Sequence, residues 1–435
     1  MVDLRVEFAG LKLKNPIVSG AGPNTKNFDQ ALKGMKAGCG AIVVRSLHLE
    51  RLDERRPPRR EFWRLHTGGK DFLKDYYSFQ STGAPAERVS RGIPPGMGGA
   101  VGTPTLPEWQ EEVAKIVRAS KQYDCAIIAS IGWCGSALAS DDLWEGEAKA
   151  MAEAGVDAIE LHNGPSPATE PGRFIMADPE KYLLNPIRIA KRAGGKPTFS
   201  KVPVDCCDVV AACRWAQSAG ADGVVPVTRW MSITVDIEAP ERPAWRGPGF
   251  GGPWSAPIMT GYIYRMRSPM RGVGHMASRR YQQQIDQNPD SNPAVTIPII
   301  PSGGARTGAD VVTYIMAGAS AVQICAQILV EGYKSVGRIQ REITGWMQRK
   351  GLSRLDEVRG TLKVLEPALI KRELPQRVAQ VDEALCTGCE VCVDPCTDEA
   401  IAMANGVAVV EPTRCEGCLN CVQVCPANAI QMVAI

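Results

Sequence analysis

The first 350 residues repeat one pattern of hydrophobic and polar positions: a short, almost wholly apolar run, then a loop, then an amphipathic helix. Short apolar runs of this kind are typical of parallel strands that are buried on both faces. The predicted strands are residues 17–20, 41–46, 126–131, 158–163, 198–202, 223–228, 298–304 and 321–326. Eight such units indicate an α/β fold, and they favour a closed (β/α)8 TIM barrel over the alternative of an open, doubly wound sheet.

Helix boundaries are also visible in this pattern. Pro107 is predicted to open a helix, because proline is tolerated in the first helical turn. The apolar stripe of that helix holds Trp109, Val113, Ile116 and Val117. Asp178, which Pro179 follows, is predicted to cap a second helix. Three more helices are expected to end at Ala-Gly pairs, at residues 37–38, 154–155 and 219–220.

Two cysteine ladders lie near the end of the chain. The first is Cys386, Cys389, Cys392 and Cys396, and the second is Cys415, Cys418, Cys421 and Cys425. Each reads C-x2-C-x2-C-x3-C, the run that holds a pair of [4Fe–4S] clusters in bacterial ferredoxins. The tight turn of three cysteines wraps only one face of a cluster, so the fourth ligand is expected from the other ladder. Disulfides and zinc are the alternatives, but zinc ribbons use two C-x2-C pairs.

Composition adds limits on compartment and partners. A net charge of +3 argues neither for nucleic acid nor for a membrane surface as a partner. No run of 18 apolar residues is present, and the charged first residues do not resemble a signal peptide. Cysteines that are predicted to be free or to hold clusters indicate a reducing, cytoplasmic location.

The chain is expected to form three parts. Residues 1–350 would be the barrel, residues 351–379 a helical linker, and residues 380–435 a small α+β ferredoxin domain. Two inserts, at about 47–105 and 229–297, follow strands and are therefore expected at the carboxyl mouth of the barrel, where barrel active sites form. Residues 247–252 match G-x-G-x-x-G, but without the strand–turn–helix context of a dinucleotide site.

The order of motifs along nearly the whole chain resembles one family. The motifs are residues 6–16 (VEFAGLKLKNP), 128–131 (IASI), 158–161 (AIEL), 221–224 (ADGV), 302–304 (SGG) and 318–325 (GASAVQIC), with Lys201 and the two cysteine ladders. This order resembles the flavin half of dihydropyrimidine dehydrogenase and its bacterial catalytic-subunit relatives, within the dihydroorotate dehydrogenase-like FMN barrels. The resemblance implies FMN at the barrel mouth.

Several positions are expected to bind that FMN. Barrels commonly bind phosphate between the loops after the seventh and eighth strands. The resemblance implies that Lys201 donates to the N1–C2=O edge of the flavin; a solvated rim lysine is the alternative. The expected FMN-binding residues are Ala21, Gly22, Arg45, Ser46, Asn163, Lys201, Thr228, Gly251, Gly252, Ser302, Gly303, Gly304, Ala326 and Gln327.

The chain departs from the family on the substrate side. Arg45 stands in place of a lysine, and Thr228 and the following arginine replace an Asn-Thr pair. Ser166 takes the place of the cysteine that donates a proton, although an ordinary loop serine is the alternative. The candidate catalytic residues are Ser166, Asn163 and His162, and His162 could equally be structural.

The inserts are rich in arginine and tryptophan. These side chains would wall a pocket for a flat, anionic substrate, or else they are solvated arginines and core tryptophans. They are Arg59, Trp63, Arg229, Trp230, Trp245, Arg246 and Trp254.

Together these features predict an iron–sulfur flavoprotein oxidoreductase that acts on CH–CH bonds. Hydride and proton would be exchanged across an activated C=C bond of a cyclic substrate, with electrons passing between FMN and two [4Fe–4S] clusters. An NAD(P)H-dependent FAD subunit or a ferredoxin is the expected electron partner, in a homo- or hetero-oligomer. Two alternatives stay open: a reductase of an aromatic, heteroaromatic or enoyl acid or thioester, and an electron-transfer subunit that uses FMN as a relay.

Overall fold

The protein forms two compact units, Met1–Leu362 and Lys363–Ile435. This computed structural model describes residues 2–46, 105–132, 140–162, 175–204, 208–227, 230–231, 249–250, 252–267, 294–363 and 377–435. Each unit is described by itself.

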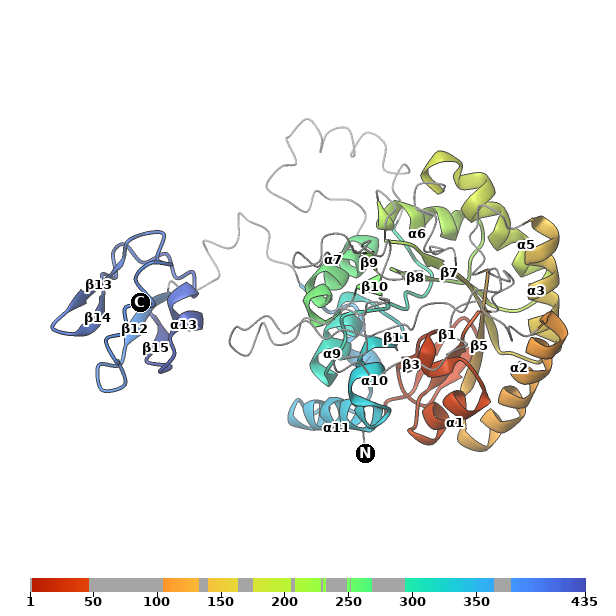
Figure 1. Cartoon of the computed structure of the whole chain (residues 1–435), viewed down its shortest axis with the longest axis horizontal. Helices are drawn as coiled ribbons and strands as arrows, with labels where there is room; N and C mark the ends of the chain where they lie inside the picture. Colours follow the sequence, from red (N-terminus) through yellow and green to blue (C-terminus); the bar gives the residue numbers. More distant parts are fainter. Residues whose placement is uncertain are drawn as a thin grey trace, which may run out of the picture. The chain divides into compact units, whose positions relative to one another are not determined.

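A curled parallel sheet lies at the centre of the first unit (Figure 1). Its seven strands follow the order β11-β3-β4-β5-β6-β7-β8. Their bounds are β3 Ile17–Ser19, β4 Ala41–Val44, β5 Ala126–Ile131, β6 Ala158–His162, β7 Thr198–Val202, β8 Gly223–Pro226 and β11 Val322–Ile324. These strands are buried on both faces because helices cover the outside and side chains fill the inside, which explains their continuous apolar runs. Seven of the eight predicted strands are confirmed.

Residues 298–302 join the two edges of this sheet. A strand was predicted over residues 298–304. The segment instead forms two isolated parallel bridges: Ile299 pairs with Val224 of β8, and Ser302 pairs with Gln323 of β11. Val224 and Gln323 donate backbone hydrogen bonds of 2.9 and 2.8 Å to carbonyls of this segment. The first unit is therefore a TIM-barrel-like α/β fold, and the prediction of a barrel over an open sheet is confirmed.

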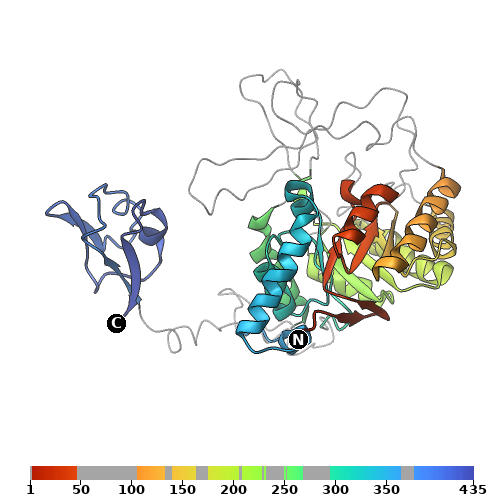
Figure 2. The same ribbon diagram turned by 90° about the horizontal axis from the view of Figure 1, so that it is seen from below.

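Among the described residues, eight helices cover the outer face of the sheet (Figures 1 and 2). They are α1 Phe28–Lys36, α2 Leu106–Ser120, α3 Asp141–Glu153, α5 Asn185–Gly194, α6 Val209–Ser218, α7 Ala256–Arg267, α9 Gly308–Ala317 and α11 Lys334–Arg349. The predicted stripe of α2 is buried. The three Ala-Gly helix ends are confirmed, since Gly38, Gly155 and Gly220 all have φ between 86° and 89°.

Shorter elements connect these helices and strands. They are η1 Pro23–Thr25, η2 Lys121–Tyr123, η3 Glu180–Leu184, β9 Trp230–Met231, β10 Gly249–Phe250, η4 Pro253–Ser255, α10 Ala326–Glu331 and η6 Leu355–Val358. Asp178 caps its helix as predicted, because its carboxylate accepts from the backbone N–H of Lys181 at 3.0 Å. The turn that follows is a π-helix, η3, which leads into α5.

The second predicted insert contains a helix of the barrel. Helix α7 lies within residues 229–297 and packs between α6 and α9, so it is the helix that follows β8 (Figure 1). Gly252, the last glycine of the run at 247–252, immediately precedes η4 and α7, contrary to expectation. Strand β10 of this run, however, pairs antiparallel with β9 over two residues only, which is not the parallel unit of a dinucleotide site.

An antiparallel hairpin covers the amino end of the barrel. It consists of β1 Val6–Phe8 and β2 Leu11–Leu13. Phe8 lies against Phe199 near the start of β7, with ring centroids 6.1 Å apart. Residues 351–362 also belong to this unit, because Gly360 donates a backbone hydrogen bond to Ile315 of α9. The open mouth is thus at the opposite, carboxyl end of the strands.

The second unit is small and has internal symmetry. Its strands are β12 Arg377–Val381, β13 Ile401–Ala404, β14 Val407–Val410 and β15 Ile430–Ala434, and its helix is α13 Asn420–Val424. Strand β12 pairs with β15, and β13 with β14. The buried core consists of three pairs whose numbers differ by 29: Ala379 and Ala408, Cys392 and Cys421, Ile401 and Ile430. The unit is therefore two copies of one 29-residue motif.

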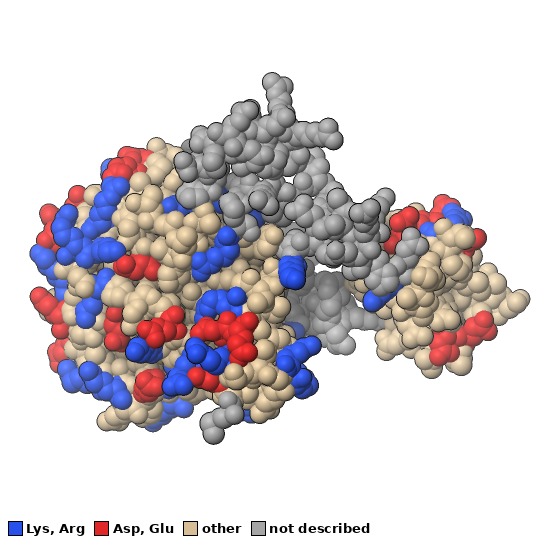
Figure 3. Space-filling model, turned by 180° about the vertical axis from the view of Figure 1, so that it is seen from behind, with Lys and Arg blue, Asp and Glu red and all other residues tan. Residues whose placement is uncertain are grey.

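The surface of the two units differs in charge. Figure 3 shows Lys, Arg, Asp and Glu interspersed over one face of the first unit. From Arg377 to the last residue, Arg377 and Arg414 are the only two basic residues, against eight acidic ones. None of the helices in the described ranges combines the length and apolar character that a membrane span requires.

Candidate functional site

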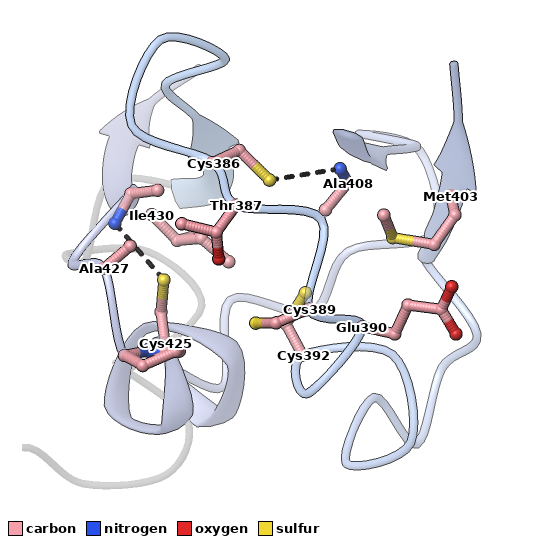
Figure 4. A pocket seen from close by; sticks show the side chains of 12 residues that line it. Cys386, Thr387, Cys389, Glu390, Cys392, Met403, Ala408, Cys425, Ala427 and Ile430 are labelled. Atoms are coloured by element: carbon pink, nitrogen blue, oxygen red, sulfur yellow. Dashed lines mark hydrogen bonds between the residues drawn. The ribbon is translucent and has the colours of Figure 1, made fainter. Parts of the chain in front are cut away.

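The eight ladder cysteines line two cavities in the second unit. Cys386, Cys389, Cys392 and Cys425 line the first cavity, of about 320 Å³, and their sulfur atoms face a common space (Figure 4). Cys396, Cys415, Cys418 and Cys421 line the second cavity, of about 330 Å³. Each ladder therefore gives three cysteines to one cavity and its remaining one to the other. The exchange of the fourth cysteine was expected from the spacing of the ladders.

Backbone amides point at the sulfur atoms of both cavities. Ala408 and Ala379 donate at 3.5 Å to Cys386 and Cys415, respectively. Ala429 and Ala400 donate at 3.2 Å to the outlying cysteines, Cys425 and Cys396. Hydrogen bonds to sulfur stabilise the negative charge of thiolates and of the clusters they hold. The two cavities share this pattern because each donor has a counterpart 29 residues away.

The cavities fit iron–sulfur clusters better than the alternatives. All twelve cysteines in the described part of the chain are free thiols, so no disulfide forms there. Nor do three His, Cys, Asp or Glu side chains in the described ranges converge as a single metal ion would require. Four soft sulfur donors instead surround a space, with Met403 or Met432 in the wall. Burial raises the pKa of Cys421 to about 11, and coordination to iron would remove its proton.

The barrel interior contains a buried polar triad. Lys201 on β7 donates to Glu160 on β6 at 3.0 Å and to Gln323 on β11 at 2.9 Å. Gln323 also donates to the other oxygen of Glu160. The exposed fractions of the three side chains are 4%, 0% and 1%. Lys201 is thus no solvated rim lysine, and two of its three N–H groups are taken by side chains that the sequence did not single out.

A second cation lies near this triad. Arg45 follows β4, and Cys325 follows β11. The positive charges of Arg45 and Lys201 both favour the thiolate form of Cys325 and so lower its pKa. Burial raises the pKa of Cys325 to about 11, while the two cations work against that rise. Arg45 therefore adds a positive charge close to the Lys201–Glu160 ion pair, which suits an anionic cofactor or substrate group.

The predicted phosphate loop has two structurally different glycines. Gly303 and Gly304 have φ of 93° and 83°, which favours glycine at both positions. A Cβ on Gly304 would lie 2.5 Å from the Tyr314 hydroxyl, so close packing alone explains the glycine at this position. A Cβ on Gly303 would meet only Ser255, at 3.9 Å, so the backbone there is open to approach by a ligand. Gln327 at the start of α10 donates to Glu331.

Other predicted positions meet at the same end of the barrel. A Cβ on Gly22 would lie 2.6 Å from the sulfur of Cys325, so the backbone after β3 runs close to the end of β11. Ser46 and Ser130 share a 2.7 Å hydrogen bond between β4 and β5. His162, at the end of β6, is buried opposite Lys201 in the β6–β7 register.

Several predicted site residues lie outside the described residues. They are Ser166, Asn163, Thr228, Gly251, Arg59, Trp63, Arg229, Trp245 and Arg246. Their assignment stays a prediction. Of the aromatic set, Trp230 and Trp254 are described, with ring centroids 5.3 Å apart at an interplanar angle of 56°.

Sequence reasoning missed a buried acid, Glu147 of α3. One carboxylate oxygen accepts from the backbone N–H of Gly132 at 2.8 Å, just after β5. The other has no hydrogen-bond partner among the described residues. Burial raises the pKa of Glu147 to about 7. The only sequence signal was a glutamate on the apolar side of an amphipathic helix, which is too weak to interpret alone.

The fold and the two cavities together define a class: a TIM-barrel-like domain followed by a 4Fe–4S ferredoxin domain, as in iron–sulfur flavoprotein oxidoreductases. Comparison with known proteins agrees. A family model described as dihydroorotate dehydrogenase matches residues 290–347. A model described as 4Fe-4S dicluster domain matches residues 379–426.

Curated relatives make the relationship more specific. The chain is 24% identical to the catalytic subunit of dihydroorotate dehydrogenase B (NAD(+)) from Alkaliphilus metalliredigens, over 83% of this chain and 99% of that protein. It is 25% identical to the same subunit from Pyrococcus furiosus, over 82% and 98%. It is 24% identical to chloroplastic dihydropyrimidine dehydrogenase (NADP(+)) from Arabidopsis thaliana, over 82% and 76%. The chain is a divergent homologue of these dehydrogenases, and the resemblance drawn from its motifs is confirmed.

Proposed function

We propose that the protein uses FMN and two [4Fe–4S] clusters to exchange hydride and proton across an activated C=C bond of a cyclic substrate. The observation that carries the proposal is the division of eight cysteines into two cavities of four, on a chain whose barrel holds Lys201 and Arg45 near the end of β11. A flavin, when bound, exchanges two electrons with a substrate and single electrons with clusters. We place the protein in a reducing cytoplasm.

In this proposal, the barrel residues hold and polarise the flavin. The backbone at Gly303 would accept the phosphate, and the remaining N–H group of Lys201 would point at the ring. Glu160 and Gln323 fix the ammonium of Lys201, so its charge is positioned before any ligand arrives. Ser166, with Asn163, would transfer the proton to the substrate, and His162 is the second candidate for this role.

The substrate is proposed to carry a negative charge. Arg45 and Lys201 both lie near the end of β11, and Arg45 can pair with a carboxylate in a bidentate manner. This favours a cyclic acid, and it also supports the second candidate function, reduction of an aromatic, heteroaromatic or enoyl acid. The two candidate functions are distinguished by which compound, a pyrimidine or such an acid, reoxidises the reduced protein.

The test starts from protein that is purified without oxygen. We expect about eight irons and one FMN for each chain. Dithionite-reduced protein is then mixed with uracil, with orotate or with an aromatic acid, and recovery of the oxidised flavin spectrum is followed. Recovery with one compound identifies the substrate class. Recovery with none, in flavin-loaded protein, would favour the electron-relay alternative, and colourless or flavin-free protein would contradict the proposal.

The electron source is proposed to be a second protein. The dihydroorotate dehydrogenase B relatives are named as catalytic subunits of an NAD(+) enzyme, which supports a partner subunit that handles the nicotinamide. An FAD protein that co-purifies and reduces the chain with NADH or NADPH would support this arrangement. Reduction by ferredoxin alone would point to the other partner, and co-purification would also report a hetero-oligomer.

A further inference from the structure

The two cluster cavities have the same framework but different charges in their walls. Three differences distinguish residues that occupy equivalent places 29 residues apart. Glu390 in the first cavity corresponds to Leu419 in the second. Thr387 corresponds to Glu416, and Ala427 corresponds to Asp398. One carboxylate therefore lines the first cavity, and two line the second.

The rest of the framework is largely matched, although Asn420 lines the second cavity and its counterpart Val391 does not line the first. The four N–H donors to sulfur repeat with the same distances, 3.5 and 3.2 Å. Met403 and Met432 lie in equivalent walls. Gly388 and Gly417 have φ of 65° and 70°, and a Cβ on either would lie 2.5 or 2.6 Å from a carbonyl oxygen of the opposite half. Ligand type, hydrogen bonding and backbone geometry therefore give no reason for the two sites to differ.

Charges farther from the cavities repeat only in part: Glu383, Asp394 and Arg377 have the neutral counterparts Pro412, Gln423 and Gly406, and none of these three charged residues lines either cavity. Arg414 forms a 3.0 Å ion pair with Glu399, and the equivalent positions in the other half hold the neutral residues Leu385 and Asn428. The pair is itself neutral. Asp382 and Glu411 are acidic counterparts of one another and line neither cavity. Within the cavity walls, the net difference in charge is the extra carboxylate of the second cavity.

Reduction adds one electron to a cluster whose thiolate ligands already make it anionic. Nearby carboxylates oppose that added charge, and net charge is one of the factors that set cluster potentials. Building on the proposed function, we propose that the cluster of the second cavity has the lower reduction potential. A single electron delivered to the unit by the flavin or by another one-electron donor then resides mainly in the first cavity, beside Glu390.

The size of the effect follows from exposure. The wall carboxylates stand at cavities that open to solvent through Cys389 and Cys418, so their Coulomb interaction is largely screened. We expect the electron to favour the first cavity about three- to tenfold, where tenfold corresponds to about 59 mV for a one-electron couple.

The experiment is a reductive titration of the full chain, with iron content measured on the same sample and reduction followed by electron paramagnetic resonance. The wild type should show two one-electron waves of unequal potential. The double variant Asp398→Ala/Glu416→Thr removes both carboxylates from the wall of the second cavity. The lower wave should therefore rise to the position of the upper wave or beyond it, while the wave of the first cavity stays where it is in the wild type. Glu390→Leu should raise the upper wave only and so widen the separation. Glu411→Gln is the control, and it should move neither wave.

The outcomes separate this inference from the proposed function. About eight irons for each chain with two coincident wild-type waves would overturn the inference and leave the proposed function intact. The inference would also be wrong if Asp398→Ala/Glu416→Thr moved the wave of the first cavity. A single wave with only half the iron would contradict the two-cluster assignment, and the inference would fail with it. Glu390→Leu provides an independent result if the double variant loads poorly.

Discussion

The two units are held together in different ways. The barrel unit has a large continuous core, with fully buried residues on all seven strands and on the inner faces of its helices. In the described part of the second unit, the core cluster has only six buried residues, and two of them are cysteines. Below about 70 residues a hydrophobic core rarely suffices, and small domains rely on metals or disulfides instead. The barrel is therefore stabilised mainly by its hydrophobic core, whereas the stability of the second unit depends on the group that its cysteines bind.

Removal of iron is therefore expected to have the largest effect, and it should affect only one unit. After oxidation and chelation, the second unit should lose its fold, because cluster binding and folding are coupled there. Hydrogen exchange measures this directly: the amides of Ala379, Ala400, Ala408 and Ala429 should lose protection. Amides of the barrel strands are the internal control. Retained protection in the second unit would show that its core suffices.

Loss of the buried lysine should be the largest single-residue effect in the barrel. Lys201→Met leaves the Glu160 carboxylate buried without its cation, which costs about 3–5 kcal/mol. The double variant Lys201→Met/Glu160→Leu should recover part of that loss. Lys191→Met is the matched control, since its ion pair with Asp222 is 45% and 30% exposed and worth at most about 1 kcal/mol. Denaturant unfolding measures all three, and equal losses at Lys201 and Lys191 would contradict the importance of burial.

The buried acid of α3 gives the barrel a pH dependence. The pKa of Glu147 is about 7, above its ordinary 4.5, so the unfolded chain releases this proton at lower pH than the folded protein. Stability should therefore fall as pH rises from about 4.5 to about 7, by an amount on the order of 3 kcal/mol.

Glu147→Gln tests this pH dependence. The variant lacks the titration, so it should match the wild type near pH 4 and exceed it at pH 8. Thermal unfolding at both pH values checks the sign, with Asp142→Asn, at an exposed position of the same helix, as the control. A constant difference between variant and wild type across this range would refute the assignment.

The smallest effect tests the symmetry of the second unit. Gly388→Ala and Gly417→Ala both place a Cβ against a carbonyl oxygen at positive φ, and each should cost about 1–2 kcal/mol or more. Gly406→Ala, also at positive φ but with no atom within 4 Å of its Cβ, should cost less. Rates of iron release report all three. Unequal effects at Gly388 and Gly417 would show that the two halves differ in more than charge.

The sequence predicted some features better than others for physical reasons. The cysteine ladders are local, so their spacing alone indicated how two cavities would be shared. The strands were visible because burial on both faces makes them apolar. Contacts between distant segments were not visible: Glu160 and Gln323 lie 41 and 122 residues from Lys201. Helix α7 was missed because the long segment around it is rich in Pro and Gly, which suggested an insert.

The shared walls of the two cavities have a consequence for the ancestry and engineering of the tail. A solitary copy of the 29-residue motif supplies three cysteines to one cavity and a single cysteine to the other, so it completes neither. Such a fragment would close its sites only by meeting a twin, as the halves of a symmetric dimer do, and assembly would then depend on concentration. Joining the copies in tandem removes that dependence, and it also lets each half acquire its own electrostatic character.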